Sequence, residues 1–165
     1  VQMGKVYRSG YGMHVSNGIL YNHESPRRGE NFVTKKIVRG AASISQGRSE
    51  FLELGNLDIE RDWGYAPDYV QGMWMMLQKE QADDYILATG KTHKLSDFLQ
   101  LSFEYFGLDY KKYIRINPKF VRPNEPVQLC GNSSKAKNIL GWKPTVSFAE
   151  IVQKMCRATG KSNNP

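Results

Sequence analysis

The chain of 165 residues is 40% hydrophobic, 12% aromatic and 24% charged, which suits one folded domain or part of a larger protein and excludes extensive disorder. No apolar run approaches the roughly 18–20 residues that cross a bilayer, and two cysteines with three scattered histidines have no metal-ligand spacing, so we expect a cytosolic protein without membrane or metal partners. The net charge of +7 comes from basic ends that flank an acidic middle, without a long Lys/Arg run, so nucleic acid is not the expected partner.

The first third of the chain predicts a helix end, a strand and a second helix. Residues 1–12 fit the tail of a helix that ends at two glycines. Residues 13–21 form an apolar, partly β-branched run, which predicts a largely buried strand before a polar loop at 22–29. A helix is predicted at 31–47. Its apolar face has helical spacing and consists of Val33, Ile37, Ala41 and Ile44.

The middle of the chain predicts a short strand at 51–54, a loop at 55–66 and a helix that starts at Pro67. Asp68 then lies near the positive end of the helix dipole. Apolar residues recur along this helix at helical spacing, and we interpret them as core rather than as a cofactor site. They are Tyr69, Val70, Met73, Trp74, Met76 and Leu77.

The last part of the chain alternates strands and helices. The predicted elements are strands at 85–88 and 113–116, a helix at 96–106 ended by Gly107, a loop at 117–132 and a short helix at 133–140. Ser147 and Glu150 have the spacing of a capping box, in which each side chain bonds the other's exposed amide at the start of a helix. Such alternation predicts an α/β or α+β fold.

Several common catalytic motifs are absent from the chain. No GxGxxG turn is present to let a backbone approach a pyrophosphate, and no tyrosine has a lysine four residues later. A GxSxG elbow, a P-loop and an HExxH motif are also missing. Candidate functional residues must therefore be sought among loop cations.

The segment 22–29, with the sequence NHESPRRG, follows the first predicted strand directly. Ligands of α/β folds bind beyond the carboxyl ends of parallel strands, so an asparagine, a histidine and two arginines at this place can face a site. Arg27 and Arg28 are the informative pair because a guanidinium binds phosphate oxygens in a bidentate way. The alternative is a solvated loop with a proline turn.

Arg61 in NLDIERDWG and Arg122 in FVRPNE are further loop arginines, each with an acidic neighbour. Lys35 and Lys36 lie near the start of a predicted helix, where the dipole already attracts an anion. Each of these residues is either part of an anion site or an ordinary surface charge.

At these same residues the sequence resembles the GDP-mannose 4,6-dehydratases, a family of extended short-chain dehydrogenases/reductases. The resemblance covers residues 11–155 in family order. The strings that carry it are SNGILYNHESPRRGENFVTKKI, LGNLDIERDWGYAPDYVQGMWMMLQ, ILATGKTHKLSDF, FVRPNEP and SSKAKNILGWKPTVSFAEIV.

The resemblance implies the end of a Rossmann-type parallel sheet at 1–30, as a remnant of the NADP-binding domain, and a smaller α/β sugar-nucleotide-binding portion at 31–165. It implies NADP as cofactor, with His23 and Arg28 as contacts, although the family's glycine-rich NADP loop and its catalytic Thr, Glu, Tyr and Lys precede the NGIL segment. The positions that match the family's GDP-mannose pocket are Asn22, Val33, Lys36, Leu54, Gly55, Arg61, Arg122 and Glu125, and Arg27 is a further candidate for the hexose.

The first hypothesis is therefore the substrate-binding part of a GDP-mannose 4,6-dehydratase, which converts GDP-mannose to GDP-4-keto-6-deoxymannose. By itself this part is expected to lack catalysis and to associate with a second copy or with a missing N-terminal half. The alternative is a non-enzymatic GDP-sugar-binding or assembly module. A third hypothesis, nucleic-acid binding through the basic ends, predicts strongly salt-dependent association.

Overall fold

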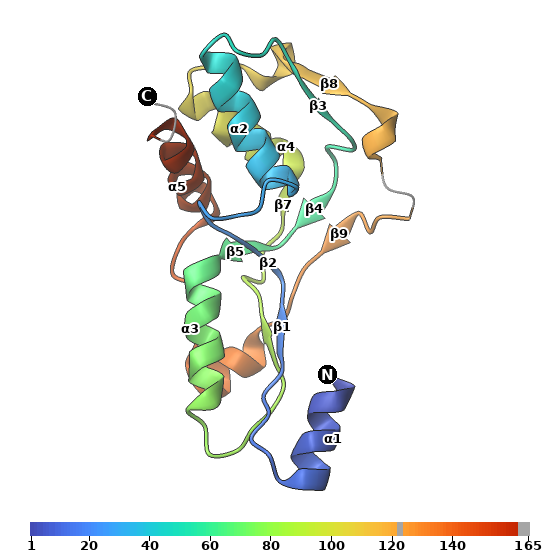
Figure 1. The fold of residues 1–165 in the computed structure, drawn as a ribbon, viewed down its shortest axis with the longest axis vertical. Helices are drawn as coiled ribbons and strands as arrows, with labels where there is room; N and C mark the ends of the chain where they lie inside the picture. The colour runs from blue at the N-terminus through green and yellow to red at the C-terminus, as the bar shows by residue number, and fades with distance from the viewer. Residues whose placement is uncertain (122–123, 162–165) are drawn as a thin grey trace.

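Parallel pairs of short strands organise the molecule, which is seen here in a computed structural model that describes residues 1–121 and 124–161 (Figure 1). The parallel pairs are β1 (Gly18–Leu20) with β6 (Tyr85–Leu87), β2 (Asn22–Glu24) with β5 (Trp63–Tyr65), and β3 (Leu52–Leu54) with β8 (Ile114–Ile116). In a further small sheet, β4 (Glu60–Arg61) lies between β7 (His93–Lys94), which is antiparallel to it, and β9 (Gln128–Leu129), which is parallel. This arrangement confirms the predicted α/β class.

Helices connect these strands. The longer ones are α1 (Gln2–Tyr11), α2 (Val33–Ser45), α3 (Ala66–Leu77), α4 (Leu95–Tyr105) and α5 (Phe148–Lys161). Three single turns are η1 (Tyr110–Lys112), η2 (Pro118–Phe120) and η3 (Ala136–Leu140). The predicted stop at Gly107 is confirmed, and Gly141 ends η3 in the same way, because both glycines have a φ of 72°, which a residue with a Cβ adopts only at a cost.

Two separate hydrophobic cores hold these elements. The first lies where α2, α4 and α5 meet in the upper half of Figure 1, and its fully buried residues include Ile37, Phe98 and Met155. The second lies between α3, β6 and η3 and is built on Tyr69 and Trp142. The proposed division of the chain at residue 30 stays a prediction.

The last helix forms as its sequence predicts. The Ser147 amide donates to the Glu150 carboxylate at 2.8 Å, and the Glu150 amide donates to the Ser147 hydroxyl at 3.4 Å. Ile151, Val152 and Met155 on its apolar face are fully buried. A capping box and an apolar face are therefore enough to define α5.

The structure corrects the predicted loop at 55–66 and the predicted strand at 13–21. The predicted loop contains β4 and β5, which pair with other strands, and Trp63 of β5 is buried against the rings of Phe98 and Phe148. The strand is shorter and less buried than expected: only β1 forms within it, and Ile19 is 40% exposed. The polar segment that follows is partly strand, since its first residues form β2.

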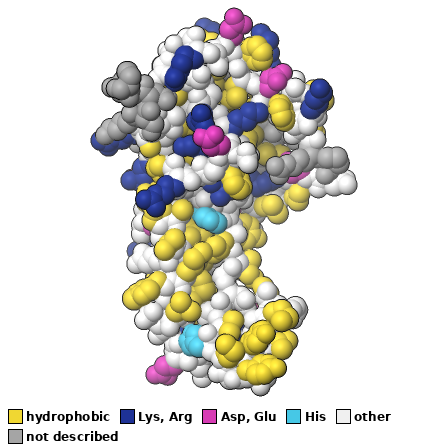
Figure 2. All heavy atoms as spheres, in the orientation of Figure 1, with side chains coloured by type: hydrophobic (Ala, Val, Ile, Leu, Met, Phe, Trp, Pro, Cys, Tyr) yellow, Lys and Arg dark blue, Asp and Glu magenta, His cyan; other side chains and the backbone are white. Residues whose placement is uncertain are grey.

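The apolar stripe of α3 is a core face only in part. Tyr69 and Met76 are buried as predicted, but the prediction is wrong for the exposed residues Val70, Met73, Trp74 and Leu77. The buried face of α3 packs closely against β6, since a Cβ at Gly72 would lie 2.7 Å from the Leu87 side chain. Figure 2 shows hydrophobic side chains gathered in the lower half of this view, whereas Lys and Arg side chains gather in the upper half.

The carboxylate of Asp84 fastens α1 to the rest of the fold. It accepts hydrogen bonds from Arg8 Nη1 at 3.0 Å and from Asn17 Nδ2 at 2.6 Å. These two hydrogen bonds lower the pKa of Asp84 to about 2. Because the pKa is lower in the folded state, this contact stabilises the fold above the ordinary carboxyl value and is lost as the pH falls toward 2.

We expect Asp84→Ala to raise hydrogen exchange of the α1 amides at pH 7, because Arg8 and Asn17 lose their common acceptor. In the unsubstituted chain, α1 should lose protection between about pH 4 and pH 2, after correction for intrinsic exchange rates. Asp58→Ala is the control, since it removes an exposed carboxylate in another part of the chain. Equal protection of α1 in Asp84→Ala and the unsubstituted chain would contradict the prediction.

Candidate functional site

Lys36 projects from the first turns of α2 to β3 and η2. Its Nζ donates to the carbonyl oxygen of Glu53 at 2.7 Å and lies 3.9 Å from the centroid of the Phe120 ring. Gly55 makes room for η2, since a Cβ there would lie 2.5 Å from the Phe120 carbonyl oxygen. The predicted residues Lys36 and Gly55 thus share one neighbour, Phe120, which the sequence interpretation did not include.

Arg61 lies in β4, and its side chain is only 9% exposed. Its Nη2 donates to Glu125 Oε1 at 2.7 Å. Its Nη1 donates to the carbonyl oxygens of Glu60 at 2.7 Å and Pro126 at 2.9 Å. The guanidinium is therefore held in one orientation by groups of the protein, and the predicted residues Arg61 and Glu125 are direct partners.

The same stretch of chain contacts both cations. Phe120, over Lys36, and Glu125, on Arg61, are five residues apart, so at most about 18 Å of backbone separates them. Arg122 lies between them in the sequence but outside the described residues. Lys36 and Gly55 thus lie against Phe120, and Arg61 pairs with Glu125 five residues later. The strands next to these contacts are β3 and β4, which Figure 1 labels.

Two further predicted pocket residues belong to the first core. Leu54 is 2% exposed and packs in that core, and Val33, the first residue of α2, is half-buried against it. Both lie next to the region of Lys36 and Gly55 in the sequence. Their contact with a ligand stays a prediction.

The residues of NHESPRRG form a second polar group around β2. His23 Nδ1 carries its hydrogen and donates it to the Tyr21 carbonyl oxygen at 2.8 Å, and the His23 ring stacks on Tyr69. Arg28 Nε lies 3.2 Å from a carboxylate oxygen of Glu24, and its guanidinium carbon lies 3.5 Å from the centroid of the Phe32 ring. His23 and Arg28, the two predicted NADP contacts, are thus neighbours.

Glu24 is the buried acid of this second group. Burial raises its pKa, while the hydrogen bond from the Thr34 hydroxyl at 2.6 Å and the charge of Arg28 oppose that shift. Arg28 Nε is a buried nitrogen without a hydrogen-bond partner. The anion beside this nitrogen is the Glu24 carboxylate, so the charge of Arg28 is already paired within the protein.

Arg27 and Asn22 complete this segment. The Arg27 side chain is exposed, in contrast to that of Arg28. Asn22 is half-buried in β2, where it pairs with Trp63. The two adjacent arginines therefore differ in exposure, and Arg27 can contact a ligand without breaking an ion pair.

Asp62 is a structural hub that the sequence interpretation missed. It is fully buried, and its carboxylate accepts hydrogen bonds from Thr89 N, Thr89 Oγ1, Gly90 N and Gly131 N at 2.6–3.2 Å. Because Asp62 follows Arg61 directly, this hub also fixes the backbone that carries the Arg61 guanidinium. The sequence signal that could have identified Asp62 is an acidic residue directly before a tryptophan, in the string ERDWG.

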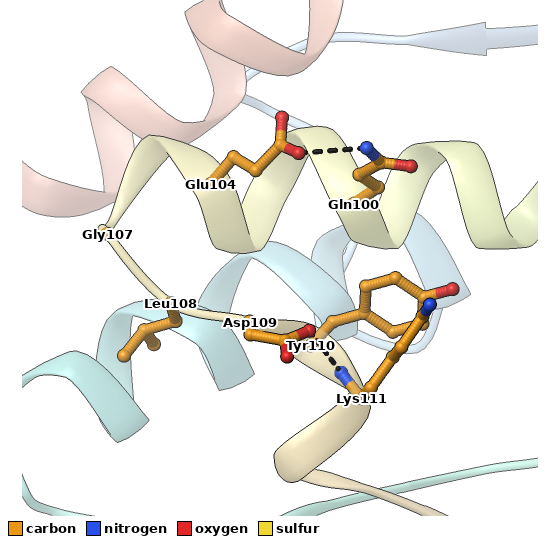
Figure 3. Close-up of a pocket in the computed structure, with 7 residues that line it drawn as sticks. All are labelled: Gln100, Glu104, Gly107, Leu108, Asp109, Tyr110 and Lys111. Carbon is orange, nitrogen blue, oxygen red and sulfur yellow. Dashed lines mark hydrogen bonds between the residues drawn. The ribbon is translucent and has the colours of Figure 1, made fainter.

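A pocket of about 400 Å³ lies elsewhere, between the end of α4 and η1 (Figure 3). Hydrogen bonds within its wall join Gln100 to Glu104 and the Lys111 amide to Asp109. None of the predicted site residues lines it. It is therefore not part of the candidate site.

The described residues form neither a membrane span nor a metal site. In residues 1–121 and 124–161, no helix is long and apolar enough to span a bilayer. Over those same residues, no three or more His, Cys, Asp or Glu side chains are grouped so that they could hold a metal ion.

Comparison with solved structures defines the class of fold. The structure of RMD from Pseudomonas aeruginosa, complexed with NADPH, has a TM-score of 0.87 at 20% identity, over 98% of this chain and 52% of that chain. Other similar structures include nucleotide-sugar epimerases and 4,6-dehydratases. The chain therefore has a Rossmann-type α/β fold, which matches about half of each of these structures.

Comparison of sequences defines the family. A family model described as GDP-mannose 4,6 dehydratase matches residues 1–155. GDP-mannose 4,6 dehydratase 2 of Arabidopsis thaliana is 53% identical over 90% of this chain and 40% of its own length. The human GDP-mannose 4,6 dehydratase is 43% identical over 92% of this chain and 45% of its own length. The chain belongs to the GDP-mannose 4,6-dehydratase family and spans less than half the length of these curated relatives.

Proposed function

We propose that this chain is the substrate-binding part of a GDP-mannose 4,6-dehydratase and that it binds GDP-mannose at the region of Lys36 and Arg61. The observation that carries the proposal is that one stretch of chain contacts both cations. Their charges suit a sugar diphosphate, and Arg122 is the third cation that we assign to it. Glu125 is suited to accept hydrogen bonds from ligand N–H or O–H groups.

In the whole enzyme, we propose that GDP-mannose becomes GDP-4-keto-6-deoxymannose with NADP as cofactor. NADP would supply the acceptor and the donor of a hydride. Of the described residues, Arg28 would hold a phosphate of NADP, while His23, fixed by Tyr21 and Tyr69, would shape the surface beside it. A cytosolic location and association with a second copy or an N-terminal half remain predictions.

A second candidate function is that of a non-enzymatic GDP-sugar-binding or assembly module. The exposed apolar side chains of α3, among them Trp74 at 61%, favour association with another polypeptide. GDP-mannose binding is common to both candidates. They differ in whether binding leads to turnover once the chain is joined to a catalytic half.

We expect the chain to bind GDP-mannose in calorimetry without converting it, and Arg61→Ala to weaken binding about 10- to 100-fold, because a charge-assisted contact to phosphate is lost. Arg122→Ala should act in the same direction. The control is Arg115→Ala, which removes an exposed arginine that lies over the Phe51 ring. Equal affinities in Arg61→Ala and Arg115→Ala would refute the assignment, and turnover by the chain alone would refute the expected lack of catalysis.

A further inference from the structure

The acid of the second polar group, Glu24, is buried rather than open to a ligand. It lies in β2, and its side chain is only 1% exposed. The Thr34 hydroxyl, on the first turn of α2, donates to Glu24 Oε2 at 2.6 Å, and Thr34 is itself buried. The same carboxylate oxygen lies 3.2 Å from Arg28 Nε. The carboxylate is therefore fixed by α2, and it can act on a ligand only through Arg28.

Arg28 is held on three sides by the protein. Its Nε faces Glu24 as an ion pair that lacks the alignment of a hydrogen bond. Its guanidinium carbon lies 3.5 Å from the centroid of the Phe32 ring, and its Nη1 donates to the His23 carbonyl oxygen at 3.4 Å. The plane and the direction of the guanidinium are thus both set.

One edge of this guanidinium stays free for an anion. Among the described residues, none accepts a hydrogen bond from Arg28 Nη2, and the Arg28 side chain is 16% exposed. A guanidinium carries its five N–H donors in a rigid plane, so fixing Nε also fixes the direction of Nη2. An anion can then bind at Nη2 without displacing the carboxylate of Glu24.

We infer that Glu24 is a positioning residue, which holds Arg28 so that its Nη2 edge points at an anion such as a cofactor phosphate. This inference rests on the proposed function, in which Arg28 binds a phosphate of NADP. The carboxylate must be ionised for this role, since a neutral acid does not attract the guanidinium. A glutamine of the same size therefore loses the orientation of Arg28, while its carbonyl oxygen can still accept from Thr34.

The charge of Glu24 links this geometry to pH. The groups that face its carboxylate are Arg28 and His23 from its own segment, Thr34 from α2 and Tyr69 from α3. Burial raises the pKa of Glu24, and Thr34, Arg28 and His23 oppose that shift. As the pH falls, Glu24 therefore takes up a proton above the ordinary carboxyl value, and Arg28 loses its anionic partner.

NMR of the chain tests the inference without a ligand. We expect the Arg28 Nε–H group to be ordered at neutral pH, as measured by nitrogen relaxation, and to become mobile in Glu24→Gln. Glu30→Gln is the matched control, since it removes the same charge from an exposed glutamate that pairs with Arg39. In the unsubstituted chain, the mobility of Arg28 should rise with the same midpoint as the protonation of Glu24, which the carbon signal of its carboxyl group reports.

Calorimetry with NADP tests the consequence for binding. We expect Glu24→Gln to weaken NADP binding about tenfold and Glu30→Gln to leave it unchanged. Because Glu24 acts through Arg28, the effect of Glu24→Gln should vanish in the Arg28→Ala background, since residues that act as one unit are not additive. A structural role alone would weaken binding equally in both backgrounds. Thermal unfolding shows whether each variant is folded.

Two results overturn the inference: Arg28 is as ordered in Glu24→Gln as in the unsubstituted chain, or Glu24→Gln weakens NADP binding equally with and without Arg28. If Glu24→Gln does not fold, the titration of the unsubstituted chain decides, because an Arg28 that stays ordered after Glu24 is protonated contradicts the role. Failure of the proposed function is distinct. In that case neither the unsubstituted chain nor any folded variant binds NADP, and the order of Arg28 alone decides the inference.

Discussion

Asp62→Ala is expected to lower the free energy of unfolding by about 1–3 kcal/mol, the cost of leaving a buried polar group without its hydrogen-bond partner. The Asp62 carboxylate is fully buried and joins its own segment to two others, because its hydrogen bonds come from Thr89 and Gly90 and from Gly131. An alanine leaves the buried Gly131 amide without an acceptor and also removes the hydrogen bonds from the less buried residues Thr89 and Gly90. Equilibrium unfolding in urea, followed by circular dichroism, measures the loss.

Asp109→Ala is the control for this prediction. Asp109 is exposed, and its carboxylate accepts a local hydrogen bond from the Lys111 amide, so its removal should change stability by less than about 1 kcal/mol. Asp62→Asn should not restore stability, because its NH₂ group would face backbone N–H donors. A loss below about 1 kcal/mol in Asp62→Ala would show that the hub is dispensable.

Gly55→Ala is expected to cost about 1–3 kcal/mol of stability and to weaken GDP binding about tenfold. The added Cβ would lie 2.5 Å from the oxygen and 2.8 Å from the carbon of the Phe120 carbonyl, so the backbone of η2 must shift. Phe120 would then move away from Lys36, which it contacts at 3.9 Å. Urea unfolding and calorimetry with GDP measure the two effects.

Gly10→Ala provides a comparison for the added methyl group. Gly10 lies in α1, where a Cβ would meet nothing within 4 Å, so alanine should be neutral or slightly stabilising there. If Gly55→Ala binds GDP as tightly as Gly10→Ala does, the close approach of η2 to β3 is not needed for the ligand.

Local sequence signals explain which elements could be predicted. The capping box of Ser147 and Glu150 defines the start of α5, because both partners lie within one turn. The spacing of Ile37 and Ala41 likewise defines the buried face of α2. Short polar strands such as β2 and β4 carry no such signal, since their pairing partners lie far away in the sequence.

The same reasoning applies to α3 and to the candidate site. Periodicity identifies the apolar residues of α3 but not whether anything covers them, so exposed Trp74 was expected in the core. Lys36 and Arg61 were candidates for an anion site from their places in the sequence, and the family resemblance added Glu125 and assigned all three to one pocket. The pairing of Arg61 with Glu125 was not predicted, because the two residues are 64 positions apart.

The parallel strand pairs also bear on how quickly the chain reaches its folded state. Each joins segments separated by tens of residues, and β3 finds its partner only at Ile114–Ile116. Contacts of such long sequence separation must close large loops before they stabilise anything, which slows refolding relative to helical bundles of equal size. During synthesis, β3 and β8 can therefore pair only after most of this polypeptide has left the ribosome.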